Sequence, residues 1–328
     1  MRVVVHPATD LPYASMVLEG FARVLGPSAI RYSTDGFPPW YRIGRTMAFY
    51  PEDAPESRCF LSFTDQPIVH PIGSAWARVH GAVNVDDRSQ AQNVVPIGPS
   101  FGVRLGARSL TIRHVAATWR WARLRDARVA VDRTRLVAEH ERRRTRADAY
   151  VPRSSDPDFV FYIAWPWSKH ADVNPPRAQF IEACRAAPGL TFEGGFAPRR
   201  RRDVPEVLAL SAARRYGITE YLERLGRSAV AFNNPAVHGC LGWKLGEFLA
   251  LGKATISLPI TRALPAPLEH GVHLHVIDGS RESIDDALER LRRDHAYRRS
   301  LEVNARRWYD EHLAPAALAR RLLGLVAR

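Results

Sequence analysis

Residues 232–254 read FNNPAVHGCLGWKLGEFLALGKA. Apolar residues predict a strand over 229–232 that runs into this stretch, and a loop with Gly239 and Gly242 follows it. Apolar residues at helical spacing then predict a helix over 241–251, and a further strand is predicted over 254–258. A strand, a loop, a helix and a strand in this order are typical of a parallel α/β sheet.

The same alternation extends on both sides of this stretch. The run FVFYIA at 159–164 is continuously apolar, as parallel strands buried on both faces are. The remaining predictions are strands over 2–6, 29–32, 59–63, 94–97, 190–192 and 273–277, and helices over 13–25, 109–125, 177–186, 218–225 and from 283 onward. The proline-rich and aromatic segment 35–58 receives no assignment.

A polar, proline-containing segment at 144–158 separates two series of strands and helices. It predicts two domains, 1–150 and 151–328, and the last helices are expected to pack back on the first domain. The fold class is therefore α/β, with two Rossmann-like domains whose parallel sheets face a central cleft. Neither half carries Gly-x-Gly-x-x-Gly after its first strand, and the chain lacks a P-loop, so dinucleotide redox and P-loop chemistry are disfavoured.

The composition is that of a folded protein whose positive charge is almost all arginine. The net charge is +13, yet the only lysines are Lys169, Lys244 and Lys253, which is more typical of a genome-wide bias than of a binding surface. The three cysteines are far apart and are expected to be buried. The N-terminal apolar run is too short for a signal peptide, so a cytoplasmic protein is expected.

The loop at 239–242 and the helix after it have the chemistry of an anion site. Glycines let backbone approach a ligand closely, and the first helical N–H groups and the helix dipole favour negative charge. Lys244 in the first turn opposes the dipole unless an anion lies close, and Glu247 shares its face one turn later. A phosphate and a pair of sugar hydroxyls would suit these two groups, and a simple surface ion pair is the alternative.

The C-terminal half resembles the donor-binding domain of group 1 glycosyltransferases, which have the GT-B fold. The resemblance covers 159–323, about half of the chain, and it rests on motifs in the right order. They are EFLALGKATI at 247–256, Glu269-His270-Gly271, the segment 285–291, Tyr297-Arg298 and Asn304-Ala305-Arg306. It implies that the chain transfers a sugar from a nucleotide-diphosphate donor, which is a co-substrate, so that no cofactor is needed.

The resemblance also implies roles for individual residues. Glu247 would bind the donor ribose, and the loop with Gly239, Cys240, Leu241 and Gly242 would bind the diphosphate beside Lys244. Lys169 would present a charge to the diphosphate, and Trp165 would stack on a base or sugar. The loop 194–199, which ends with Arg199, would approach the nucleobase. Retaining members have a glutamate where this chain has Gly239, so the retaining mechanism does not carry over, and His238 becomes a candidate to face the sugar.

An inverting reaction would need a base from the first domain. Asp10 and Asp65 each follow a predicted strand there, although both also suit turns and helix caps. No Asp-x-Asp motif or histidine cluster predicts a metal site. The acceptor would be a saccharide, a lipid-linked or a small molecule, and the arginines at 142–146 could contact a membrane that holds it.

Two other functions fit parts of the sequence. A nucleotide-sugar epimerase of the same fold would give product without an acceptor. A basic nucleic-acid-binding protein would lose affinity steeply with salt, but the chain has no recognised binding motif, so no nucleic-acid partner is expected.

Overall fold

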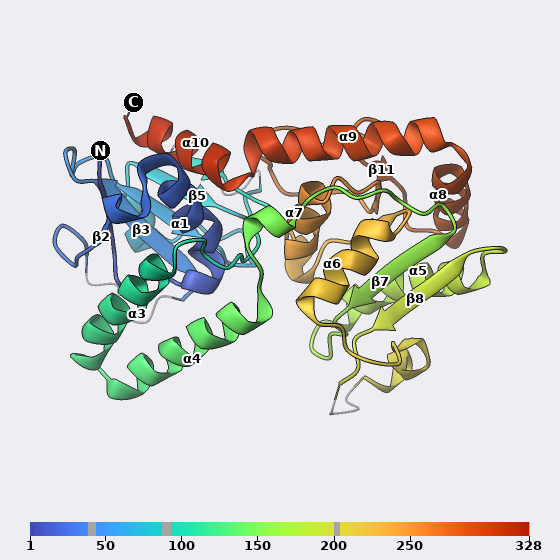
Figure 1. Cartoon of the computed structure of the whole chain (residues 1–328), viewed down its shortest axis with the longest axis horizontal. Coiled ribbons are helices and arrows are strands. Elements are labelled where there is room, and N and C mark those ends of the chain that lie inside the picture. The colour runs from blue at the N-terminus through green and yellow to red at the C-terminus, as the bar shows by residue number, and fades with distance from the viewer. Residues whose placement is uncertain (39–43, 87–92, 200–203, 328) are drawn as a thin grey trace. The chain divides into compact units, whose positions relative to one another are not determined.

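The structure is a computed structural model that describes residues 1–38, 44–86, 93–199 and 204–327. The chain forms two compact units (Figure 1). Unit 1 comprises Met1–Ala149, Arg262–Ala266 and Glu311–Arg328, and unit 2 comprises Tyr150–Thr261 and Pro267–Asp310. The α/β class is confirmed in both.

Unit 1 is built on a six-stranded sheet with the order β2-β1-β3-β4-β5-β6. Its strands are β1 (Val3–Val5), β2 (Ile30–Tyr32), β3 (Thr46–Pro51), β4 (Cys59–Ser62), β5 (Val79–Ala82) and β6 (Val94–Pro96). The three valines of β1 are fully buried, as the continuous apolar run at the N-terminus requires. The helix α1 (Leu11–Leu25) links β1 to β2 as a parallel crossover.

Two strands of this sheet, β3 and β5, were not predicted, and β3 departs from the predicted parallel direction. β3 lies in the segment that received no assignment and runs antiparallel to both β1 and β4. Only the short connection 52–58 joins β3 to β4, and a connection of that length permits an antiparallel pair, whereas a parallel pair needs a dozen or more residues. β4 pairs parallel with β5 across the helix α2 (Pro71–Trp76).

The remaining helices of unit 1 are α3 (Arg108–Arg123), α4 (Ala127–Arg143) and α10 (Pro315–Ala327). α10 packs on α1 at Gly20, where an added Cβ would lie 2.0 Å from the carbonyl oxygen of Pro315 and 2.8 Å from the Cβ of Ala319. The two helices can therefore approach this closely only because residue 20 has no side chain.

The described residues of unit 2 form the parallel strands β7 (Phe159–Ala164), β8 (Thr191–Phe196), β9 (Ala231–Asn233), β10 (Thr255–Ser257) and β11 (His275–Val276). β7 pairs with β8, and β10 lies between β9 and β11. The two ladders adjoin, because the N–H of Ala229 donates to the carbonyl of Phe159 and a bridge joins Asp156 to Ser228. The strand order β8-β7-β9-β10-β11 is a doubly wound arrangement.

Helices cover both faces of the unit 2 sheet. They are α5 (Asn174–Ala186), α6 (Ile218–Arg227), α7 (Trp243–Ala250), α8 (Arg281–Arg293) and α9 (His295–His312). Tyr162 meets Phe180 of α5 with ring centroids 5.2 Å apart, whereas its neighbour Phe161 meets Tyr221 of α6 on the other face at 6.0 Å. Successive side chains of β7 thus bury against helices on opposite sides, as its wholly apolar sequence predicts.

The three cysteines are buried, as predicted. Within the described residues, no helix has the length and the apolar character needed to cross a membrane.

Burial lowers the pKa of the histidines inside unit 1, among them His6, His80 and His114. Desolvation is the main reason that the pKa of His6 falls to about 4, and the nearby guanidinium groups of Arg125 and Arg133 add to it. Desolvation also lowers the pKa of His114 to about 3, with a smaller contribution from Arg133. Burial lowers the pKa of His80 to about 4, with a smaller contribution from His70. Neither ring nitrogen of His80 has a hydrogen-bond partner among the described residues, and the ring packs edge-on against Phe60.

These depressed pKa values make the stability of unit 1 fall with acid. The unfolded chain binds a proton at His80 near pH 6.5, but the folded chain does so only near pH 4, so lowering the pH through this window favours unfolding. Between pH 7 and pH 5 we expect wild-type protein to lose roughly 1–2 kcal/mol more unfolding free energy than His80→Leu. Urea denaturation at both pH values measures the difference, and equal losses in the two proteins would contradict the burial argument.

Candidate functional site

The strand order of unit 2 reverses between β7 and β9. From β7 the chain passes to β8 on one side, whereas β9, β10 and β11 lie on the other. In doubly wound sheets the loops on either side of such a reversal leave toward opposite faces, and ligands bind beyond the carboxyl ends of the strands at this point. Here the two loops are 165–173 after β7 and 234–242 after β9.

A buried arginine joins these loops. The Arg177 guanidinium, on α5, donates from Nε to Oδ1 of Asn234 at 2.9 Å and from a terminal nitrogen to the carbonyl of Trp165 at 2.9 Å. Asn174 fixes the first loop further, because its side-chain amide exchanges two hydrogen bonds with the backbone of Trp167. Arg177 and Asn174 therefore fix the starts of the two loops where they leave β7 and β9.

The loop after β9 makes a tight 3-10 turn at Val237–Gly239. His238 adopts φ 57° and ψ 22°, a left-handed conformation that is uncommon for a residue other than glycine. Its exposed ring meets the ring of His170 from the other loop, with centroids 5.2 Å apart. Strained backbone of this kind is concentrated at functional sites.

The four residues predicted to bind the diphosphate, 239–242, have different surroundings in the structure. The N–H of Gly239 donates to the carbonyl of Ala236, and the N–H of Cys240 donates to that of Val237, so both amides serve the turn itself. Cys240 and Leu241 are buried, and Cys240 packs against Val173 and Val237. Gly242 then forms the N-cap of α7 and brings no side chain to it.

Lys244 lies in the first turn of α7 and reaches back over the end of β7. Its ammonium group donates to the carbonyl of Ile163. It also lies 5.3 Å from the ring centroid of Tyr221 and 5.8 Å from that of Tyr162. The only cation in this first turn thus sits at the carboxyl edge of the sheet, among described residues of β7, α6 and α7.

Glu247 follows one turn later and is buried. Its Oε2 accepts a hydrogen bond of 2.9 Å from the hydroxyl of Tyr221, the same side chain whose ring lies beneath Lys244.

A small hollow of about 10 Å³ at the start of α7 is lined by Gly239, Gly242 and their neighbours. A space of this size holds about one water molecule.

Trp165 and Arg199, predicted on separate loops, come together. The guanidinium of Arg199 lies 5.4 Å from the ring centroid of Trp165 and donates to the carbonyl of Pro166, and Arg215 lies 5.9 Å from the same ring. Trp165 and Lys169 are exposed. Two guanidinium groups therefore gather around an exposed indole ring after β7.

Sequence reasoning did not find Arg177, Tyr221 or Arg215 as parts of this site. Arg177 and Tyr221 read as ordinary helical positions, because only the fold brings α5 and α6 to the ends of β7 and β9. The adjacent arginines at 214 and 215 were a visible signal, but nothing in the sequence indicated that the second one meets Trp165.

The loop predicted at 194–199 is wrong in its first half. Gly194 and Gly195 belong to β8 and have φ values of 120° and 128°. A Cβ at Gly194 would lie 1.9 Å from the carbonyl oxygen of Tyr162, and one at Gly195 would lie 2.2 Å from that of Leu210. These glycines let β8 lie close against its neighbours, so their role is packing within the sheet.

In unit 1, the two predicted bases are brought together by one arginine. Oδ2 of Asp10 accepts the backbone N–H of Arg45 at 2.8 Å, and the guanidinium of Arg45 pairs with Asp65 at 2.5 Å. Arg45 has φ 55° and also lies 5.3 Å from the ring centroid of Tyr13, whose pKa is raised by burial. Asp10 and Asp65 therefore occupy one polar cluster after β1 and β4 of the same sheet.

Within the part of the chain that the structure describes, no three His, Cys, Asp or Glu side chains are grouped as metal ligands.

No protein-family model matches the sequence, and no curated protein sequence matches it. Among solved structures, the chain is similar to Anabaena Alr3699/HepE in complex with UDP, at a TM-score of 0.47 and 10% identity over 81% of this chain and 71% of that one. The chain is also similar to a glycosyltransferase from Rickettsia africae, with a TM-score of 0.45 and 11% identity over 81% of this chain and 69% of that one. For TarM the TM-score is 0.41 and the identity 11%, and the match covers 53% of this chain but only 36% of TarM. Likeness this distant does not establish a shared activity.

The packing role of Gly194 can be tested by adding one methyl group. We expect Gly194→Ala to lower the unfolding free energy by roughly 2 kcal/mol or more, because the Cβ would strain a positive φ and collide with backbone that cannot move without opening the β7–β8 pair. Thermal denaturation measures the loss. Gly324→Ala, in an exposed helical position with open space around it, should instead be neutral or slightly stabilising. A Gly194→Ala protein as stable as the wild type would contradict this packing role.

Proposed function

We propose that the protein is a glycosyltransferase that takes a sugar from a nucleotide-diphosphate donor held by unit 2. The observation that carries the proposal is the meeting of Lys244 and Glu247 at Tyr221, beyond the carboxyl end of β7. A cation and a carboxylate on adjoining turns, at the reversal of a doubly wound sheet, provide one partner for phosphate and one for paired hydroxyls.

The diphosphate would lie at the start of α7. Gly242 carries no side chain there, so a phosphate can approach the first turn, where the helix dipole favours negative charge. Lys244 would exchange its hydrogen bond to the carbonyl of Ile163 for one to a phosphate oxygen. A cation in the first turn is unfavourable for the free helix and becomes favourable once an anion is bound.

The ribose would lie over Glu247, whose carboxylate accepts the Tyr221 hydroxyl at Oε2 and would accept from vicinal hydroxyls of the sugar. The hollow at the start of α7 is far smaller than a diphosphate, so the loop at 235–242 has to shift when the donor binds. The strained backbone at His238 marks the residue at which this loop can change conformation.

The chemistry would need a base for the acceptor hydroxyl and stabilisation of the departing diphosphate. The second task falls to Lys244 and the helix terminus. For the first, Asp10 and Asp65 of unit 1 and His238 of unit 2 are the candidates. The proposal requires neither a metal ion nor a cofactor. Its acceptor is a hydroxyl of a saccharide, of a lipid-linked molecule or of a small molecule.

Calorimetric titration with UDP, GDP, dTDP and CDP tests the donor site. We expect at least one nucleotide to bind, and we expect Lys244→Gln to weaken it roughly 10- to 100-fold, because a hydrogen bond to a charged group contributes about 1.5–3 kcal/mol. Glu247→Gln should weaken the same nucleotide through the ribose, and it should have a smaller effect on free diphosphate, which lacks the hydroxyls.

Arg293→Gln is the matched control, since it removes one positive charge from an exposed position of α8 in the same unit. It should leave nucleotide affinity unchanged. Folding of each variant is checked by circular dichroism. The proposal fails if none of the four nucleotides binds to the folded protein, or if binding is indifferent to both Lys244 and Glu247.

A further inference from the structure

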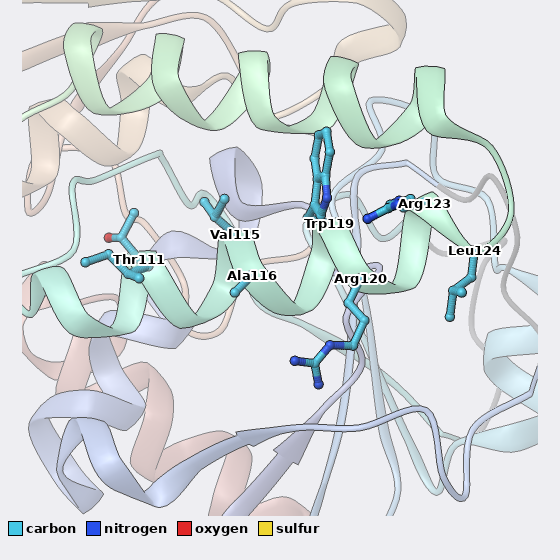
Figure 2. A pocket seen from close by; sticks show the side chains of 8 residues that line it. Thr111, Val115, Ala116, Trp119, Arg120, Arg123 and Leu124 are labelled. Atoms are coloured by element: carbon cyan, nitrogen blue, oxygen red, sulfur yellow. The ribbon is translucent and has the colours of Figure 1, made fainter.

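The helix α3 has a second, outward face that carries exposed apolar side chains. Its inner face buries Leu110, His114 and Trp121. On the outer side, a groove of about 730 Å³ is lined by residues of α3 and its C-cap (Figure 2). Ile112 is 67% exposed, Trp119 39% and Leu124 81%.

These side chains follow helical spacing, with Val115 and Ala116 between Ile112 and Trp119. Figure 2 shows Trp119 directed toward α4 and Arg120 directed away from it. The guanidinium of Arg120 therefore lies along the side of the apolar strip that faces away from α4. A contiguous apolar surface with a polar rim marks a site of interaction rather than a solvated face.

The positive charge of α3 favours an anionic partner. Sixteen residues of α3 include four arginines and no aspartate or glutamate. Arg113 turns inward to the carbonyls of Ile30 and Pro27, whereas Arg108, Arg120 and Arg123 are exposed. An exposed strip of Ile, Val and Trp bordered by arginines has the composition of helices that lie in the plane of an anionic bilayer surface.

Self-association fits this face less well. A two-fold dimer places each patch against the same patch of the second copy, so Arg120 and Arg123 would meet their own counterparts without any acid from α3 to neutralise them. The arginines at 142–146 are also less suitable for a membrane, because Arg143 pairs with Glu139 and Arg146 with Asp148.

We propose that the outer face of α3, from Arg108 to Leu124, docks on the surface of an anionic lipid bilayer. Ile112 and Trp119 enter the boundary between headgroups and acyl chains, and Arg120 and Arg123 contact lipid phosphates while their aliphatic stems lie along the apolar strip. This inference is independent of sugar transfer. It would hold a lipid-linked acceptor and the protein on the same surface.

Co-sedimentation of the full chain with vesicles of phosphatidylglycerol and phosphatidylcholine tests this docking, with pure phosphatidylcholine vesicles for comparison. We expect binding to the anionic vesicles, lowered at least about fivefold by Arg120→Glu, since a charge near such a surface changes affinity by about this factor. The double variant Ile112→Ser/Trp119→Ser should lower it at least as much, because the apolar strip supplies the insertion.

Two controls separate a local surface from the overall charge of +13. Arg293→Glu makes the same charge change on α8, and Val303→Ser removes an exposed apolar side chain from α9. Both should leave vesicle binding unchanged, and near-UV circular dichroism confirms that each variant is folded. The proposal is overturned if the protein does not bind anionic vesicles, if Arg293→Glu weakens binding as much as Arg120→Glu, or if gel filtration shows a dimer that Ile112→Ser/Trp119→Ser dissociates.

Discussion

The geometry of the candidate site depends on one buried guanidinium. Arg177 bonds to the carbonyl of Trp165 and to the side chain of Asn234, and so connects the loops that leave β7 and β9 toward opposite faces of the sheet. A buried charge of this kind is stable only when its hydrogen bonds are satisfied, and the two loops satisfy it. Because the loops are held by this group, the strand reversal becomes a defined edge at which polar side chains from three helices converge.

The chemistry of that edge follows from the sequence of β7 and α7. The apolar run of β7 buries both of its faces, so its end presents backbone rather than polar side chains, and the carbonyl of Ile163 is the group that Lys244 reaches. The α7 helix starts without a side-chain cap, which leaves the first turn accessible to a ligand. Lys244 and Glu247 then meet at Tyr221 because α6 crosses the same face of the sheet. Each group is ordinary alone, and their convergence is the basis of the proposed nucleotide-diphosphate site.

The parts of this structure that the sequence predicted are those with a periodic signal. The β7 strand coincides with FVFYIA, and the helix that carries Lys244 and Glu247 starts within two residues of its predicted position. β3 was missed because prolines and aromatics at 35–58 hide a short antiparallel strand. Gly194 and Gly195 suggest a loop in sequence, and only the approach of Tyr162 shows that they belong to a strand. Arg177, Tyr221 and the pairing of Asp10 and Asp65 with Arg45 depend on contacts between residues distant in the chain, which no local pattern contains.

A crystal structure of the protein with UDP bound would test most directly whether the carboxyl edge of β7 and β9 is a diphosphate site. The account predicts that phosphate oxygens lie within hydrogen-bond distance of the Lys244 ammonium and the first turn of α7, that the loop at 235–242 has moved, and that ribose hydroxyls contact Glu247. A nucleotide bound elsewhere on the chain, with Lys244 still on the carbonyl of Ile163 and Glu247 still covered, would contradict it.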